Sequence, residues 1–416
     1  MMAEIAVMGH GVVGSGVMEV LISHKDSIAK RAKEEVHVKH ILDLREFPGL
    51  PYSGIFTKDF NRIVNDPQVK IVVEVMGGLE PAYTYVKACL ENGKSVVTSN
   101  KELVAQKGAE LLALAQKNNL NFLFEASVGG GIPIIRPISQ CLAANEMTEI
   151  AGILNGTTNF ILTKMIHDKM DFSDALKLAQ ELGYAERNPS ADVDGHDACR
   201  KICILADLAY GKNVAPEAVH TEGISSISLR DVAYANAAGY SIKLIGRAKP
   251  EGDGLLCMVS PALLPKESPL AGISGVFNGI LVRGNAIGDV LFYGQGAGKL
   301  ATASAVVADM IDMAKSKDYV SSLSWVDDGK NYVVDYKTTS VAFYVRLQGK
   351  DLRNQIYRQF EQVTFIEHLR EAEDEIAFIT PAMVEKDFYS KIAALSSHGV
   401  QLKNSIRVLD YGKATE

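Results

Sequence analysis

Short apolar runs alternate with amphipathic segments along the first 131 residues of the chain. The runs, bounded by glycine or polar residues, predict strands at residues 4–9, 36–44, 69–76, 94–100 and 120–127. Apolar residues at helical spacing predict helices at residues 12–25, 80–93 and 101–119. Strands that alternate with helices are typical of βαβ units, which build a parallel sheet. The pattern therefore predicts an α/β fold with a Rossmann-type dinucleotide-binding domain at residues 1–131.

The hydrophobic pattern changes after residue 131. Helices are predicted at residues 172–183 and 195–210, and short strands at 279–284 and 289–298. We expect residues 132–300 to form an α+β domain for substrate binding and dimerisation. A helical run at residues 299–315 and a polar connector at 316–338 follow. We expect residues 301–337 to comprise a helix that returns to the nucleotide domain, and this connector.

The last part of the chain, residues 338–416, has its own order of elements. Strands are predicted at residues 339–348, 364–372, 375–380 and 405–412, and helices at 352–363 and 383–399. This βαββαβ order is the ferredoxin-like pattern. It predicts a third, ferredoxin-like domain.

Composition and charge narrow the class of protein. The formal net charge of −7 argues against nucleic acid or an anionic membrane as the main partner. The five cysteines are scattered and form no C-x-x-C pair, which favours buried thiols in a reducing cytoplasm. No apolar run approaches the ~18 residues of a transmembrane helix, and the N-terminus lacks the pattern of a signal peptide. We therefore expect a cytoplasmic protein that acts on a small molecule.

A glycine-rich turn joins the first predicted strand to the first predicted helix. Its sequence, GHGVVG, matches G-x-G-x-x-G with Gly9, Gly11 and Gly14, and it includes Val12 and Val13. The first glycine allows a tight turn, the second lets the backbone approach a pyrophosphate, and the third lets helix and strand pack closely. The helix N-terminus then faces the phosphates with free N–H groups. A plain βα turn is the alternative, but the strand–turn–helix context predicts a dinucleotide site.

Two charged residues follow the second predicted strand. A carboxylate such as Asp43 can bind the adenosine ribose hydroxyls and favours NAD. A guanidinium such as that of Arg45 can pair with a 2′-phosphate and favours NADP. The presence of both residues leaves the cofactor, NAD or NADP, open, and Arg45 could also be a solvated charge at a strand end.

The segment DVDGHDACRK, residues 192–201, gathers many polar side chains. It lacks the glycine and distal glutamate of a calcium loop and the cysteine and histidine spacing of a zinc site. On the predicted helix, Asp197 and Lys201 are four residues apart and share a face with apolar residues. A surface ion pair is the common arrangement for such spacing. Its place on the apolar face instead predicts a pair that lines a cleft, where a lysine can donate a proton.

With these features in view, the sequence resembles homoserine dehydrogenase, which reduces aspartate 4-semialdehyde to homoserine. The resemblance covers residues 1 to about 315 and rests on seven stretches in family order. They read GHGVVGSGV, VVEVMGG, VVTSNKELVA, FEASVGGGIPII, GILNGTTNFIL, LGYAERNPSADVDGHDACRKICILA and YGQGAGKLATASAV. The resemblance implies an NAD(P)-dependent enzyme of threonine and methionine biosynthesis that assembles as a homodimer or homotetramer.

The resemblance also implies roles for single residues. Lys201 matches the family's proton donor to the carbonyl oxygen, and Asp197 matches the carboxylate that orients substrate and lysine. Glu186 matches a glutamate that binds the substrate's amino group. Lys101 matches a lysine near the cofactor, and Gly298 matches a residue that closes over the nucleotide.

A further match concerns a monovalent cation, sodium or potassium. Glu125, Val128, Gly130 and Ile132 match a family loop that holds such an ion, mostly through backbone carbonyls. A glycine-rich break after a strand fits this role, although Glu125 could also be an ordinary carboxylate at a strand end.

The sequence departs from the family pattern at two places. Leu42 replaces the usual basic residue before the aspartate of the second strand, which weakens a preference for NADP. The tail resembles an ACT regulatory domain, but GKDLRNQ replaces its D-x-P-G-V turn. Glycine and proline give that turn its shape and its access to a ligand, so we expect weak or no inhibition by threonine and a role of the tail in dimerisation.

Two other functions are compatible with the same features. One is a semialdehyde dehydrogenase that works through a thioester, which needs a nucleophilic cysteine. Cys199 and Cys203 lie within the apolar predicted helix, where thiols are expected to be inert. The other is a non-catalytic sensor of nucleotides or amino acids, against which the presence of Lys201 argues.

Overall fold

The computed structural model describes residues 2–315, 320–367 and 374–411. Contacts between residues divide the chain into two compact units. The first unit comprises Met1–Glu146, Cys203–Pro216 and Phe292–Asn331, and the second comprises Met147–Ile202, Glu217–Leu291 and Tyr332–Glu416. The domain boundaries expected at residues 131, 300 and 337 remain predictions.

A parallel sheet forms the centre of the first unit. Its strand order is β3-β2-β1-β4-β5-β6, and each neighbouring pair is parallel. The strands are β1 (Met2–Met8), β2 (Glu35–Leu42), β3 (Phe56–Thr57), β4 (Val69–Glu74), β5 (Ser95–Thr98) and β6 (Phe122–Leu123). β4 is buried at five of its six positions, because helices cover both faces of such a sheet. The predicted parallel α/β sheet is therefore confirmed.

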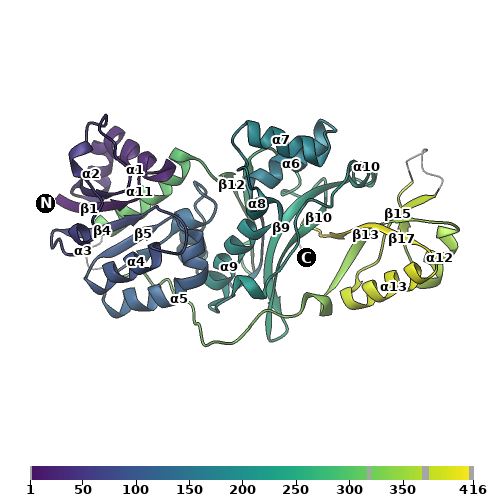
Figure 1. Cartoon of the computed structure of the whole chain (residues 1–416). Helices are drawn as coiled ribbons and strands as arrows, with labels where there is room; N and C mark the ends of the chain where they lie inside the picture. Colours follow the sequence, from purple (N-terminus) through teal and green to yellow (C-terminus); the bar gives the residue numbers. More distant parts are fainter. Residues whose placement is uncertain (1, 316–319, 368–373, 412–416) are drawn as a thin grey trace. The chain divides into compact units, whose positions relative to one another are not determined.

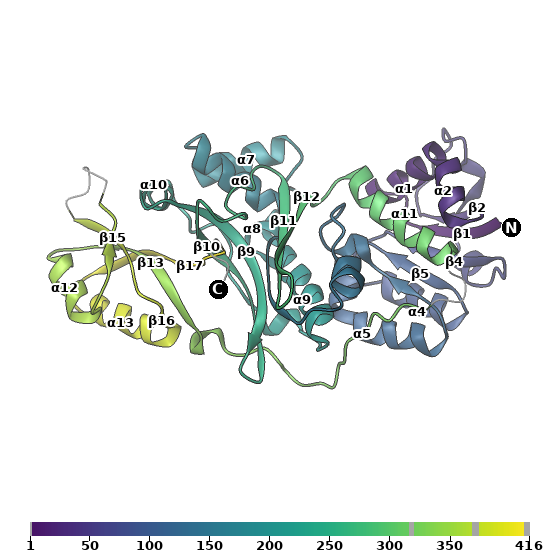
Figure 2. The same ribbon diagram turned by 180° about the vertical axis from the view of Figure 1, so that it is seen from behind.

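Helices cover the two faces of this sheet. Figures 1 and 2 show α1, α2 and α11 over one face and α4 and α5 over the other. The helices of the unit are α1 (Val12–Ser23), α2 (Lys25–Ala32), α3 (Asn61–Val64), α4 (Ala82–Glu91), α5 (Lys101–Lys117) and α11 (Lys299–Lys315). α11 packs so closely on α1 that a Cβ on Gly16 would lie 2.7 Å from the Lys299 carbonyl oxygen.

A mixed sheet forms the centre of the second unit. Its strand order is β12-β11-β7-β9-β10-β17-β13-β15-β14, with β8 paired to β10 and β16 paired to β13. The strands are β7 (Met147–Ile153), β8 (His220–Thr221), β9 (Tyr240–Glu251), β10 (Gly254–Pro265), β11 (Phe277–Gly284), β12 (Gly288–Gln295), β13 (Ser340–Gln348), β14 (Thr364–Phe365), β15 (Glu375–Ile379), β16 (Met383–Val384) and β17 (Gln401–Val408). The helices are α6 (Gly156–His167), α7 (Phe172–Glu181), α8 (Ser190–Val193), α9 (His196–Tyr210), α10 (Leu229–Ala237), α12 (Leu352–Gln359) and α13 (Glu385–Ser397).

The tail contributes four main strands to this mixed sheet. In the described residues the elements of the tail follow one another along the chain in the order βαββαβ. Its strands lie side by side in the sheet in the order β17-β13-β15-β14. β17 pairs in parallel with β10, where Ala262 faces Arg407. The Arg407 guanidinium also donates to Glu222 at 2.8 Å and to Glu385 at 2.7 Å. Backbone pairing and a buried ion-pair network thus join the tail to the rest of the second unit.

Several predicted elements differ from the structure. The predicted strand at residues 120–127 is only β6, because a 3-10 helix at Glu125–Ser127 follows it. The predicted helix at residues 12–25 ends at Ser23, and α2 is an additional helix. The last strand begins at Gln401 rather than at residue 405, and β9 and β10 were not predicted. Most of the strand predicted at residues 364–372 falls on 368–373, which lie outside the described residues, as do 316–319 of the connector.

Every helix within the described residues is too short or too polar to span a bilayer.

Candidate active site

The predicted glycine-rich turn lies at the carboxyl end of β1, next to β4. Gly9 has a φ of 102°, and a Cβ there would lie 2.9 Å from the Val75 carbonyl oxygen. A Cβ on Gly14 would lie 2.0 Å from the Gly9 carbonyl oxygen. A Cβ on Gly11 would meet nothing within 4 Å, so the approach to this backbone is open. The strand order reverses between β1 and β4, where dinucleotides bind in such sheets.

Four other predicted cofactor residues lie in the same unit. Val12 is 69% exposed and begins α1, followed by the partly exposed Val13. Lys101 begins α5, directly after the carboxyl end of β5. Gly298 has a φ of 131° and precedes α11, where its carbonyl oxygen accepts from Thr302 N–H. The helix start at Val12 follows β1 and the one at Lys101 follows β5, and both strands are neighbours of β4 in the parallel sheet.

Asp43 and Arg45 form a bidentate pair beside the glycine turn. Arg45 Nε donates to Asp43 Oδ1 at 3.0 Å, and Arg45 Nη2 donates to Oδ2 at 2.9 Å. The backbone N–H of His10 also donates to Asp43 Oδ2, at 2.8 Å. The hydrogen bonds from Arg45 hold the pKa of Asp43 well below its usual range. Both residues line a cavity of about 440 Å³ together with Gly9 and Gly11.

The structure also reveals a role for His10 that the sequence analysis did not predict. Its imidazole Nε2 lies 3.2 Å from the Tyr52 hydroxyl, and its ring contacts Phe47 and Phe56 edge to face. Burial lowers the pKa of His10. This cluster fixes the segment that follows Asp43, and its aromatic residues lie too far along the chain to be recognised from the glycine pattern.

The predicted buried ion pair lies on α9 in the second unit. Lys201 Nζ is 2.7 Å from Asp197 Oδ2 and donates to the Leu154 carbonyl oxygen at 2.7 Å. Asp197 is 6% exposed and Lys201 is 8% exposed. The helix and the placement of the pair on its buried face are therefore confirmed. An ammonium group with two protein acceptors is held in one orientation.

Asn155 is a site residue that the sequence analysis missed. It is the N-cap of α6, and its side-chain oxygen accepts from Thr158 N–H at 2.9 Å. Its amide nitrogen donates to Asp197 Oδ2 at 2.9 Å and to Asp192 Oδ1 at 2.7 Å. Asparagine before a helical run is a known capping signal, so the cap itself could have been predicted. The two aspartate contacts span 42 and 37 residues of sequence and could not.

Glu186 does not belong to the hydrogen-bonded group of Asp197, Lys201 and Asn155 in the described residues. It is exposed in the segment between α7 and α8, and its backbone oxygen accepts from Gln180 Nε2 at 3.1 Å. Within the described residues, no hydrogen bond joins its carboxylate to Asp197 or Lys201. The carboxylate is thus open to solvent, and its substrate role stays a prediction.

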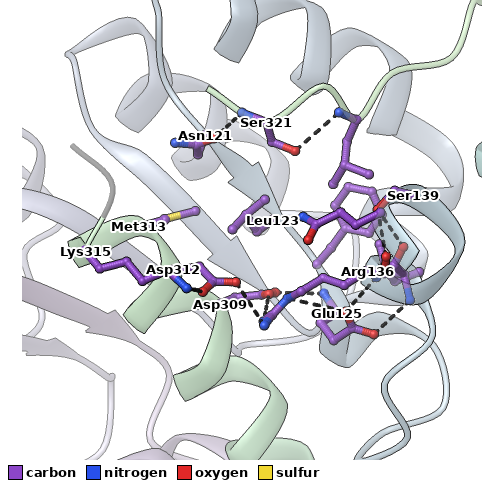
Figure 3. Close-up of a pocket in the computed structure, with 14 residues that line it drawn as sticks. Asn121, Leu123, Glu125, Arg136, Ser139, Asp309, Asp312, Met313, Lys315 and Ser321 are labelled. Carbon is purple, nitrogen blue, oxygen red and sulfur yellow. Dashed lines mark hydrogen bonds and ion pairs between the residues drawn. The ribbon is translucent and has the colours of Figure 1, made fainter. Parts of the chain in front are cut away.

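The predicted cation loop lies in the first unit, and its first residue, Glu125, lines a cavity of about 250 Å³ (Figure 3). The Glu125 carboxylate accepts from the backbone N–H groups of Ile134, Ile135 and Arg136 at 2.6–2.9 Å. The Arg136 guanidinium donates to Asp309 at 2.5 Å, as Figure 3 shows. Because its carboxylate binds backbone, Glu125 could offer a cation its carbonyl oxygen only.

Val128, Gly130 and Ile132 follow in the same loop. Gly129 and Gly130 have φ values of 72° and 56°, which turn successive peptide planes sharply. A Cβ on Gly130 would lie 2.5 Å from the Gly296 carbonyl oxygen, so this position requires glycine. A tight loop of this kind can direct carbonyl oxygens toward one point.

The polar segment at residues 192–201 holds no metal-type cluster in the part of the chain that the structure describes. No group of three or more histidine, cysteine, aspartate or glutamate side chains there could hold a metal ion. Cys199 and Cys203 are buried within α9. Their burial gives a substrate no access to either thiol.

Family models match two parts of the chain. The homoserine dehydrogenase model matches residues 133–311, and the model of the homoserine dehydrogenase NAD-binding domain matches residues 9–125. Homoserine dehydrogenase of Neisseria gonorrhoeae is 38% identical over 413 residues, which cover 95% of each chain.

Solved structures agree with these matches. A homoserine dehydrogenase from Thiobacillus denitrificans is similar with a TM-score of 0.91 and 35% identity, covering 99% of both chains. A hyperthermophilic archaeal homoserine dehydrogenase in complex with NADPH has a TM-score of 0.66 and 29% identity, covering 76% of this chain and 98% of the other. Together with the glycine turn and the buried lysine–aspartate pair, these similarities show that the chain belongs to the homoserine dehydrogenase family.

Proposed function

We propose that this chain catalyses the NAD(P)H-dependent reduction of L-aspartate 4-semialdehyde to L-homoserine, a step of threonine and methionine biosynthesis. The observation that carries this proposal is the buried pair of Lys201 and Asp197, on the helix where the family's catalytic residues stand. The family membership and the open glycine turn support the same reaction.

The chain's residues supply the proton and the orientation for this step. The nicotinamide, when bound, supplies the hydride to the aldehyde carbon. Negative charge then grows on the carbonyl oxygen, and the Lys201 ammonium stabilises it and donates the proton. Asp197, at 2.7 Å, favours the charged form of Lys201 and fixes its direction. In the reverse direction, neutral Lys201 would accept the proton from the homoserine hydroxyl.

Glu186 would hold the other end of the substrate. Its exposed carboxylate can bind the substrate's ammonium group, and such binding orients the aldehyde for reaction.

The first unit has the features of an NAD(P) site. Asp43 and Arg45 line the cavity next to the glycine turn, and NADPH is bound by an archaeal relative. Asp43 would accept hydrogen bonds from the ribose hydroxyls of NADH, and Arg45 would pair with the 2′-phosphate of NADPH. Lys101 and Gly298 would lie near the nucleotide. An Arg45→Ala variant should raise KM for NADPH more than KM for NADH if this division is right.

A monovalent cation, sodium or potassium, is part of the proposal. The carbonyls of Glu125, Val128, Gly130 and Ile132 would hold it, since oxygen ligands suit such ions. Initial rates in sodium or potassium chloride, compared with tetramethylammonium chloride at equal ionic strength, test this. Equal rates in all three salts would argue against the ion.

The tail at residues 338–416 is proposed to be an ACT-like domain that supports a homodimer or homotetramer in the cytoplasm. The strand order β17-β13-β15-β14 agrees with the ferredoxin-like pattern. Leu352 is 5% exposed and packs into the tail core, while the Arg353 guanidinium lies 4.4 Å from the centre of the Phe365 ring. Both side chains belong to the changed segment, where they begin α12, and their packing there favours assembly over amino-acid binding. Light scattering after size-exclusion chromatography measures the assembly.

One set of kinetics tests the reaction. Steady-state rates with aspartate semialdehyde are measured with NADH and with NADPH, each with and without threonine. Serine variants of Cys199 and Cys203 serve as controls against thioester chemistry, and they should keep their activity because both thiols are buried. Loss of turnover in either variant, with its fold intact, would favour the thioester route.

A further inference from the structure

Asn155 connects a helix N-terminus with the proposed catalytic pair. We propose that Asn155 is a positioning residue, which uses its capping bonds to α6 to hold Asp197, and with it Lys201, in the reactive arrangement. This inference rests on the proposed roles of Asp197 and Lys201.

The helix fixes which way the Asn155 amide points. Its Oδ1 accepts from Thr158 N–H at 2.9 Å and lies 3.1 Å from Thr158 Oγ1. An amide oxygen can accept these bonds and an amide nitrogen cannot, so Nδ2 must point the opposite way. There both of its N–H donors find carboxylates, Asp197 at 2.9 Å and Asp192 at 2.7 Å. The amide is 5% exposed, so little water competes for these bonds.

The segment 154–155 therefore contacts both members of the pair. Asp197 Oδ2 accepts from Asn155 Nδ2 and from Lys201 Nζ at once. Lys201 Nζ also donates to the carbonyl oxygen of Leu154, the preceding residue. A movement of this short segment would displace the carboxylate and the ammonium together. Catalytic groups lose rate when displaced by about 1 Å, on the order of 10²-fold.

The amide also separates two like charges. Asp192 of α8 and Asp197 of α9 each lie within 2.9 Å of the same nitrogen, and Asp197 also accepts from the Lys201 ammonium. A donor between two carboxylates stabilises both in their ionised form, and its loss increases the repulsion between them.

An Asn155→Asp substitution separates the capping role from the positioning role. Aspartate caps a helix as well as asparagine does, so a purely structural role predicts normal stability and normal rates. Positioning predicts the opposite, because an ionised carboxylate cannot donate to Asp192 or Asp197. We expect kcat of the folded variant to fall about 10²-fold at neutral pH, and the midpoint of thermal unfolding to fall with it, because three carboxylates then share one buried site.

The pH profile gives the distinguishing readout. In the described residues the Asn155 amide contacts the carboxylates of Asp192 and Asp197, and Lys201 is bonded to Asp197 beside it. The two carboxylates raise the pKa of the introduced carboxyl, and as the pH falls through that pKa the group gains an O–H donor. The kcat deficit of Asn155→Asp relative to the unmodified enzyme should therefore shrink as the pH is lowered. Asp171→Asn is the matched control: it makes the reverse exchange at the exposed N-cap of α7, and its kcat ratio to the unmodified enzyme should stay near one at every pH.

The outcomes distinguish this inference from the proposed function. A normal kcat for Asn155→Asp at neutral pH, alongside an inactive Lys201→Ala, would overturn the positioning role and leave the reaction standing. A deficit of equal size at every pH would also overturn it. A normal kcat for Lys201→Ala would overturn the proposed chemistry itself. A deficit at neutral pH that shrinks in acid supports the role of Asn155.

Discussion

Replacing Lys201 by alanine tests the proposed chemistry most directly. The change removes the ammonium group of a lysine that is 8% exposed and that donates to Asp197 and to the Leu154 carbonyl oxygen. The glycine turn that would bind the nucleotide lies in the other unit of the chain. We therefore expect the variant to lose turnover and to keep its affinity for NAD(P)H.

The size of the effect follows from two separate contributions. Loss of a general acid costs about 10²–10⁴-fold in rate, or about 3–5 kcal/mol of activation free energy. Removing one partner of a buried ion pair costs about 3–5 kcal/mol of folding stability. Asn155 still donates to Asp197 in the variant, so the loss of folding stability should lie near the lower end of this range. A domain with about 5–15 kcal/mol of stability stays folded after such a loss.

Three measurements on the same preparation give the answer. Steady-state kinetics with aspartate semialdehyde give kcat, fluorescence titration gives the Kd of NAD(P)H, and thermal unfolding gives the folded fraction. A folded variant that binds nucleotide and turns over at the unmodified rate would refute the assignment of Lys201 as proton donor. A variant that has lost nucleotide binding as well would show that Lys201 acts on the fold instead.

Three further predictions concern other parts of the chain. Glu186→Gln should raise KM for the substrate more than it lowers kcat, because binding shared by ground and transition states appears in KM, and an unchanged KM would show that the carboxylate does not bind substrate. Threonine should inhibit weakly or not at all, since Leu352 and Arg353 of the changed segment pack at the start of α12; strong inhibition at low threonine would contradict this. Burial lowers the pKa of Lys243 in β9 from 10.5 to about 8. Between about pH 8 and 10.5 the unfolded chain therefore keeps a proton that the folded chain has lost. The free energy of unfolding should rise over this range, by up to about 3 kcal/mol. Denaturant unfolding at a series of pH values should show this rise in the unmodified chain and not in Lys243→Met. The same dependence of the unfolding free energy on pH in both proteins would refute the prediction.

Local patterns made the first unit predictable. The steps from β1 to α1, from β4 to α4 and from β5 to α5 are short, so each strand, its turn and its helix are neighbours in sequence. The pair of Asp197 and Lys201 was predictable for the same reason, because four residues of helix bring them together. The contacts of Asn155 depend instead on where α8 and α9 lie relative to β7, which no local pattern contains.

The long strands of the second unit were missed for a physical reason. β10 is buried at ten consecutive positions, so its sequence lacks the alternation of a half-buried strand. It also contains Pro261, which argues against a strand in a sequence reading. At Glu125 a strand was predicted where none exists. The apolar run predicted a strand through this residue, but its carboxylate accepts from three backbone N–H groups and the residue begins a 3-10 helix.

The parallel pairing of β17 with β10 has a consequence for how the tail is studied. Deleting the tail would uncover the backbone donors and acceptors of β10 beside Ala262 and Leu263. An uncovered strand edge of apolar residues is a site of aggregation. The deletion would also leave Glu222 without Arg407. Substitutions within the turn at residues 349–353, which leave β17 in place, are therefore the changes that isolate effector binding from solubility.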